Sequence, residues 1–160
     1  MDLFNHQTIK LNNAELEYWP QWLNNIEANK LFSILLEETP WQQDYLSIAG
    51  KRIAVPRLQA WYGDLQASYQ YSGLTLTPIS WTKTLKNVRD RLNKLTNNDF
   101  NALLINLYRD QQDSVAWHAD DEQELGINPI IASVSLGESR TFNMKPKGGG
   151  SGFKLPLENG

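Results

Sequence analysis

The sequence contains no cysteine, which excludes disulfide bonds and thiolate metal sites. It also has no long apolar run, so no membrane-spanning helix is expected. The first six residues, Met1–His6, lack the basic and apolar segments of a secretory signal. We therefore expect a cytoplasmic protein, or a nuclear one in a eukaryote, although a lack of cysteine is compatible with any compartment.

Acidic residues slightly outnumber basic ones, and the net charge of −3 argues mildly against electrostatic binding of a long nucleic acid. The charge is unevenly distributed, at −5 for residues 1–44, +6 for 45–109 and −4 for 110–160. The basic block either contacts phosphates or is a solvated helix face. Its candidate cations are Lys83, Lys86, Arg89, Arg91 and Lys94.

The length of 160 residues and the 41% hydrophobic content suit one globular domain, residues 1–160. Apolar spacing predicts a helix over 28–38, ended by Pro40. A second helix is predicted from a cap at Ser80 to Asn97-Asn98. Its apolar stripe consists of Leu85, Val88, Leu92 and Leu95.

The opening 25 residues are polar and aromatic, with Tyr18-Trp19-Pro20 as a turn or an extended arm. The rest of the chain reads as short strands. The strands are expected at 53–62 (before a Gly63-Asp64 turn), 100–108, 130–136, 140–145 and 153–157. Gly137–Ser139 would join two of them in a tight hairpin, and Gly148–Gly152 would form a flexible loop. This order predicts an α+β fold with a jelly-roll sheet.

Chemistry-bearing residues gather around His118 and Asp120, which lie two positions apart. In an extended segment both side chains project from one face and can bind one divalent ion. A hydrogen-bonded surface pair is the alternative for this common spacing. Asn106 and Tyr108 share a strand face upstream. Each would offer one hydrogen bond to a carboxylate or keto-acid oxygen. In the alternative, Asn106 merely ends the strand and Tyr108 packs in the core.

Several motifs together resemble the AlkB family of Fe(II)/2-oxoglutarate-dependent dioxygenases, in particular the branch that repairs alkylated DNA. They are Val55–Asp64, Tyr71–Leu74, Asn106–Asp110, Trp117–Glu122 and Pro129–Gly137. The likeness covers residues 45–160, with 1–44 as an N-terminal extension. It implies a double-stranded β-helix (jelly-roll) core with the N-terminal helices packed on it.

The resemblance assigns roles by position. It implies that His118 and Asp120 ligate Fe(II) and that Asn106 and Tyr108 bind the co-substrate 2-oxoglutarate. Tyr69 and Tyr71 would stack on a flipped base, which is worth about 1–3 kcal/mol per base, unless they pack in the core. Asp121 and Glu122 match acidic positions of the family that lie near the base, where a carboxylate can accept a hydrogen bond from an exocyclic amine. In the alternative, they are solvated charges on a loop.

The segment Ile48-Ala49-Gly50-Lys51-Arg52 falls where the DNA-repair branch has a hairpin that wedges a bulky side chain into the duplex. Here Ala49 occupies the wedge position and Ile48 precedes it. This departure argues against a strong preference for duplex and suggests either Ile48 as a weaker wedge or a single-stranded substrate. Lys51, Arg52 and Arg57 remain candidates for phosphate contacts.

The implied activity is oxidative demethylation of bases such as 1-methyladenine and 3-methylcytosine in DNA or RNA, with release of formaldehyde and succinate. The family's third ligand, a histidine, follows a motif like Leu157–Gly160, so we expect a C-terminally truncated member without its last strands. Such a chain would bind iron and 2-oxoglutarate weakly, and would be monomeric if its barrel were complete. The alternatives are a non-catalytic nucleic-acid-binding module, an inactive truncated enzyme, and an oxygenase acting on protein or lipid.

Overall fold

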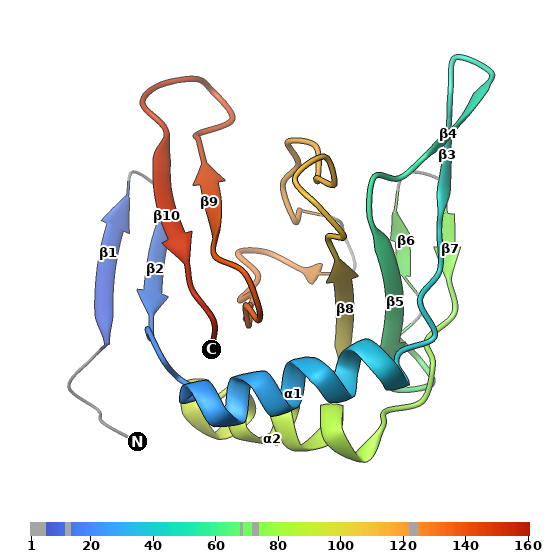
Figure 1. Ribbon diagram of the computed structural model, residues 1–160. Coiled ribbons are helices and arrows are strands. Elements are labelled where there is room, and N and C mark those ends of the chain that lie inside the picture. Colours follow the sequence, from blue (N-terminus) through green and yellow to red (C-terminus); the bar gives the residue numbers. More distant parts are fainter. Residues whose placement is uncertain (1–5, 12–13, 68, 72–73, 122–124) are drawn as a thin grey trace. The chain divides into compact units, whose positions relative to one another are not determined.

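The computed structural model describes residues 6–11, 14–67, 69–71, 74–121 and 125–160 (Figure 1). These residues form two helices and ten strands, so the expected mixture of α and β structure is confirmed. The described strands pair into five two-stranded antiparallel sheets. The continuous jelly-roll sheet stays a prediction. No helix in the described ranges is both long and apolar enough to span a membrane.

The chain divides into two compact units, one of Met1–Glu38 with Ser133–Gly160 and one of Thr39–Ala132. The first unit contains β1 (Gln7–Leu11), β2 (Ala14–Tyr18), α1 (Asn25–Glu38), β9 (Arg140–Met144) and β10 (Phe153–Leu157). The second contains β3 (Tyr45–Ile48), β4 (Lys51–Ala54), β5 (Leu58–Gly63), β6 (Tyr69–Tyr71), β7 (Leu74–Leu76), α2 (Lys83–Thr96) and β8 (Ala102–Leu107).

Helix α1 begins three residues earlier than expected because Asn24 caps it. The Asn24 side-chain oxygen accepts the backbone N–H groups of Ile26 and Glu27, both at 3.0 Å. The Glu27 carboxylate accepts the Asn24 N–H in return, at 3.3 Å. This reciprocal capping box satisfies donors that a helix start otherwise leaves unpaired. The helix ends at Glu38, as Pro40 predicts.

The opening residues, for which the sequence predicts only a turn or arm at Tyr18-Trp19-Pro20, form the antiparallel pair β1–β2 with Leu11 opposite Ala14. The chain turns at Pro20, as one of the two expected forms. The apolar residues Ile9 and Leu16 face each other in this register. A period-two alternation of apolar and polar residues was therefore present in the sequence, although we predicted no strand from it.

The predicted strand 130–136 and the Gly137–Ser139 hairpin are wrong. Strand β9 pairs with β10, and residues 131–136 belong to no strand. Backbone groups of Ser135 and Gly137 bond to residues 159 and 160 instead. The Gly137 N–H donates to the Asn159 side chain at 2.9 Å, and the Ser135 carbonyl accepts the Gly160 N–H at 2.8 Å. The strands expected at 140–145 and 153–157 are confirmed.

Gly160 fits its place only as a glycine. Its φ is +86°, and its carbonyl accepts the N–H of Leu23 at 2.9 Å. A Cβ at this position would collide with the Leu23 carbonyl oxygen. Leu23 is 2% exposed and Ala28 0%, so Gly160 lies against buried residues at the start of α1.

The predicted strand 53–62 is broken in two by Pro56, which is a correction to the sequence analysis. The N–H of Arg57 donates to the Val55 carbonyl at 2.7 Å, which closes a tight turn centred on the proline. Proline has no N–H for a sheet ladder, so the chain leaves β4 here and begins β5.

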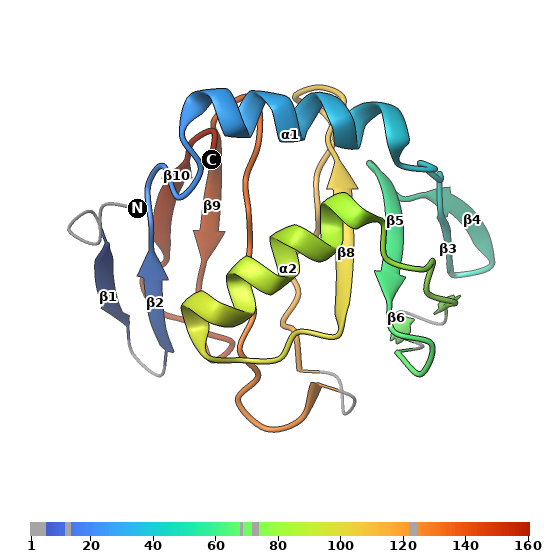
Figure 2. The ribbon, with the colours of Figure 1, turned by 90° about the horizontal axis from the view of Figure 1, so that it is seen from below.

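Strands β5 and β8 of the second unit pair antiparallel, with Gln59 opposite Asn106 and Trp61 opposite Leu104. The strand residues Ala60 and Tyr62 are 5% and 1% exposed. Figure 2 shows the molecule from below, with α2 in front of β8. Leu85, the first residue of the predicted apolar stripe, is the buried residue of α2.

The N-cap of α2 is Thr82 and not the predicted Ser80. The Thr82 hydroxyl accepts the Leu85 N–H at 3.1 Å. Ile79 forms a parallel bridge with Tyr62, so the chain is still held to β5 just before Ser80. The predicted end is confirmed, because Asn97 adopts the left-handed conformation (φ 52°) and its N–H reaches the Asn93 carbonyl.

This difference between two hydroxyl residues can be tested by stability. We expect Thr82→Ala to lower the free energy of unfolding by about 1 kcal/mol, because the helix loses its cap. Ser80→Ala is the matched control and should change it by less than about 0.5 kcal/mol. Urea denaturation followed by circular dichroism measures both. Equal losses in the two variants would contradict the assignment of the cap.

Candidate functional site

The His118 side chain is oriented by its own backbone segment. Its Nδ1 lies 2.9 Å from the Ala116 carbonyl oxygen. A carbonyl only accepts hydrogen bonds, so Nδ1 carries the proton and Nε2 keeps a free lone pair in the neutral ring. That Nε2 faces Asp120 Oδ1 at 3.5 Å. A metal-ligating histidine commonly donates its other ring N–H to a backbone carbonyl in this way, which leaves Nε2 available as the ligand here.

The donor set of His118 and Asp120 fits a divalent cation. A lone pair and a carboxylate oxygen that face each other need either a proton or a cation between them. Two ligands at about 2.1 Å on adjacent corners of a metal lie about 3 Å apart, close to the observed separation. The two side chains are 39% and 42% exposed, so a cation can reach them. Within the described ranges no cluster of three such ligands is found.

Asn106 is held at the end of β8 by an arginine from the start of β5. The Nε of Arg57 donates to Asn106 Oδ1 at 2.9 Å. Tyr108, the second residue proposed to contact 2-oxoglutarate, lies just after β8 and is half-buried. The predicted shared strand face therefore ends between them, at Leu107, although the two positions remain two residues apart.

Arg57 does not lie where a phosphate contact would require it. The residue is 5% exposed, and its guanidinium bonds Asn106 and, at 3.4 Å, the Ser114 carbonyl. The backbone phosphates of a nucleic acid need cations at the surface. Arg57 therefore bonds groups inside the protein, and its guanidinium is not placed to contact a phosphate at the surface.

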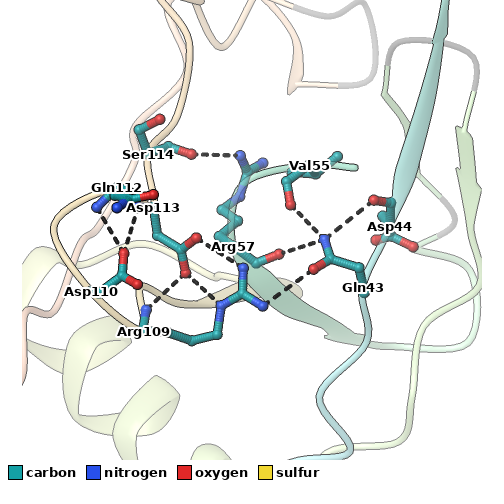
Figure 3. Close-up of polar contacts among 9 residues, drawn as sticks. All are labelled: Gln43, Asp44, Val55, Arg57, Arg109, Asp110, Gln112, Asp113 and Ser114. Atoms are coloured by element: carbon teal, nitrogen blue, oxygen red, sulfur yellow. Dashed lines mark hydrogen bonds and ion pairs between the residues drawn. The ribbon is translucent and has the colours of Figure 1, made fainter. Parts of the chain in front are cut away.

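A polar network fastens the loop between β8 and His118 (Figure 3). The buried Asp113 carboxylate accepts three hydrogen bonds from Arg109, from its backbone N–H and Nε at 2.8 Å each and from Nη2 at 2.9 Å. The pKa of Arg109 is raised above its ordinary value, chiefly by this hydrogen bonding. Ser114 N–H donates to the Pro56 carbonyl at 2.8 Å. The loop is therefore tied to the turn that precedes β5.

Gln43 joins this network from a part of the chain that the resemblance did not cover. Its side-chain nitrogen donates to the carbonyls of Val55 at 2.5 Å and Arg57 at 3.2 Å. Its oxygen accepts from Arg109 at 3.4 Å. Sequence reasoning missed Gln43, Arg109 and Asp113. A signal existed only for the last two, which have opposite charges four positions apart.

The expected hairpin is present as β3–β4, with Ile48 opposite Lys51. Its two-residue turn consists of Ala49 and Gly50, with φ values of 47° and 75°. Two positive φ values are typical of the type I′ turn that suits tight hairpins. Lys51 and Arg52 are exposed on this hairpin, and Arg52 lies over the Tyr45 ring at 3.9 Å.

The remaining predicted site residues are only partly described. Tyr69 and Tyr71 belong to β6, which pairs with β7, and of these two residues only the backbone is described. Asp121 is exposed just after Asp120, whereas Glu122 lies outside the described residues. The structure brings together Arg57 with Asn106 and His118 with Asp120. It also fastens the Asp113–Ser114 segment, which leads to His118, onto the β5 side.

Comparisons with known proteins agree with this arrangement of motifs. The model of the 2OG-Fe(II) oxygenase superfamily matches residues 15–160. The chain is 41% identical over 143 residues to the human alpha-ketoglutarate-dependent dioxygenase alkB homolog 3, covering 89% of this chain and 47% of that protein. It is 44% identical over 124 residues to the DNA oxidative demethylase ALKBH2 of Bos taurus, covering 76% and 45% respectively.

The chain thus spans about half the length of the curated relatives it matches. The match nevertheless extends over most of this chain and includes the segments that hold His118, Asp120 and Asn106. The chain belongs to the 2OG-Fe(II) oxygenase superfamily and, within it, to the AlkB family.

Proposed function

We propose that this protein oxidatively demethylates N-alkylated bases, such as 1-methyladenine and 3-methylcytosine, in nucleic acid. The observation that supports this most directly is the pairing of His118 Nε2 with Asp120 Oδ1 at 3.5 Å in a chain of this family. One relative is itself named a DNA oxidative demethylase. The fold we propose around the site is the double-stranded β-helix of the family.

In this proposal His118 and Asp120 supply two ligands of Fe(II). Asn106 and Tyr108 donate hydrogen bonds to 2-oxoglutarate. Together with O2, the bound iron and 2-oxoglutarate supply the oxidising power that hydroxylates the methyl group, with succinate and CO2 as by-products. The hydroxymethyl product then loses formaldehyde and leaves the unmodified base.

The side chains of the protein bind and orient the substrate. Tyr69 and Tyr71 stack on the extruded base, and Asp121 and Glu122 accept hydrogen bonds from its exocyclic amine. Lys51 on the β3–β4 hairpin contacts the phosphates. With Ala49 at its tip, this hairpin offers a poor wedge for a duplex, which favours single-stranded substrate and leaves Ile48 as a minor wedge. We propose a monomer located in the cytoplasm or, in a eukaryote, the nucleus.

The test is product formation from a methylated oligonucleotide. The protein is incubated with Fe(II), 2-oxoglutarate and a single-stranded oligonucleotide containing one 1-methyladenine. We expect formaldehyde and succinate in equal amounts, with one formaldehyde per restored adenine. The unmethylated oligonucleotide should release no formaldehyde. Tight binding of the methylated strand without formaldehyde would identify a binding module and overturn the proposal.

A further inference from the structure

Arg57 is a buried cation whose hydrogen-bond partners are uncharged. The residue is 5% exposed. Among the described residues, its guanidinium donates to the amide oxygen of Asn106 at 2.9 Å and to the carbonyl oxygen of Ser114 at 3.4 Å. Burying a charge is costly unless it is hydrogen-bonded, and an arginine buried in this way is seldom without a specific role.

The contact fixes which end of the Asn106 amide is free. A guanidinium has five N–H donors and no acceptor, so only the oxygen of an amide can face it. The Nδ2 group of Asn106 must therefore point away from Arg57 and present its two N–H donors. Without the arginine, the amide could rotate and present its oxygen, which would repel a carboxylate.

We propose that Arg57 is a positioning residue that sets the Asn106 amide for the carboxylate of 2-oxoglutarate. This inference rests on the function proposed above, in which Asn106 binds that co-substrate. It replaces the phosphate contact expected for Arg57 from the sequence.

The backbone around Arg57 is held on several sides. Its N–H donates to the Val55 carbonyl at 2.7 Å, and its own carbonyl accepts from the Gln43 side chain at 3.2 Å. Asn106 lies opposite Gln59 in the β5–β8 register. The Gln59 side chain is fixed in turn by the Asp44 carboxylate at 2.6 Å. Both partners of the Arg57–Asn106 bond thus sit on restrained backbone.

The experiment measures 2-oxoglutarate binding to the Mn(II)-loaded protein by anaerobic calorimetry. We expect Arg57→Met to raise the Kd for 2-oxoglutarate roughly tenfold, because a charge-assisted hydrogen bond is lost and the amide is freed. Arg57→Lys should recover only part of this, since a point charge lacks the planar fork. Arg89→Met, which removes an arginine that contacts Asp64 and not Asn106, is the matched control and should leave the Kd unchanged.

A double-mutant cycle tests whether Arg57 acts through Asn106. Asn106→Ala alone should weaken 2-oxoglutarate binding, and adding Arg57→Met should cause no further loss. Additive losses in the double variant would overturn the positioning role. In turnover assays, Arg57→Met should raise the KM for 2-oxoglutarate while kcat falls by a smaller factor.

A ligand-free measurement separates failure of this inference from failure of the proposed function. The side-chain amide resonances of Asn106, followed by nitrogen-15 NMR, should shift and broaden in Arg57→Met and stay unchanged in Arg89→Met. Unshifted resonances would overturn the inference even if the wild type binds 2-oxoglutarate. Shifted resonances in a wild-type protein that binds no 2-oxoglutarate would uphold the orientation of the amide and overturn the proposed function.

Discussion

Replacing Asp120 with alanine is expected to abolish formaldehyde release and to lower the affinity for Mn(II) or Fe(II) by more than about a hundredfold. Losing an outer partner of a metal ligand already costs about 10–100-fold in affinity or activity, and a direct ligand should cost more. Asp120 Oδ1 is the atom that faces His118 Nε2 at 3.5 Å. Calorimetric titration with Mn(II) under argon measures the affinity, and a fluorogenic formaldehyde assay measures turnover.

The matched control is Asp90→Ala, which removes an exposed carboxylate that pairs with Arg89 on α2. It should leave the Mn(II) affinity unchanged. The affinity of Asp120→Ala for a methylated oligonucleotide should also stay close to the wild-type value, because the base pocket is untouched. Wild-type metal affinity in Asp120→Ala would show that the pair with His118 is only a surface contact.

Asp113→Ala is expected to cause the largest loss of stability among the site residues, about 2 kcal/mol, because it leaves three donors of Arg109 without their acceptor. Asp113 is 5% exposed and accepts three hydrogen bonds from Arg109. The backbone N–H of Arg109 is the donor least able to find another partner. Urea denaturation gives the free energy of unfolding.

Two variants sharpen this measurement. Asp113→Asn keeps one acceptor oxygen and should lose about half as much stability. Asp99→Ala removes an exposed carboxylate and should change the free energy of unfolding by less than about 0.5 kcal/mol.

The stability that Asp113 gains from Arg109 should not depend on pH in the neutral range. The raised pKa of Arg109 means that this stabilisation is present below the ordinary arginine pKa and is lost only as the pH rises through the folded value. The loss should therefore be similar at pH 6 and pH 9, and a loss confined to one of them would contradict the assignment.

Local patterns predicted the elements that depend on local causes. The end of α2 at Asn97 and the strand at 153–157 follow from residues that lie within the element itself. The capping box of Asn24 and Glu27 was equally readable, so the late start predicted for α1 was an avoidable error. Thr82 differs, because its choice over Ser80 depends on a distant contact, in which Ile79 bonds to Trp61 and Gly63 of β5.

The candidate site was predictable in part for the same reason. His118 and Asp120 stand out because their spacing is short and their chemistry is specific. The hydrogen bond between Gln43 and Arg109 spans 66 positions, and no local sequence pattern around either residue predicts it. The sequence predicts a phosphate contact for Arg57 because arginine is cationic and usually exposed. Its burial could not be predicted, because it depends on how the folded chain packs and not on the residue type.

The contact of Gly160 with Leu23 joins two segments of one compact unit that lie far apart in the sequence. The unit of Thr39–Ala132 is one continuous segment, whereas the other unit joins Met1–Glu38 to Ser133–Gly160. During synthesis the continuous unit can fold while the ribosome is still making the rest. The discontinuous unit can form only after both of its segments are made, and it must then close a loop of more than 90 residues, which is entropically slower. The segment bearing His118 and Asp120 therefore belongs to the part of the chain that can fold first.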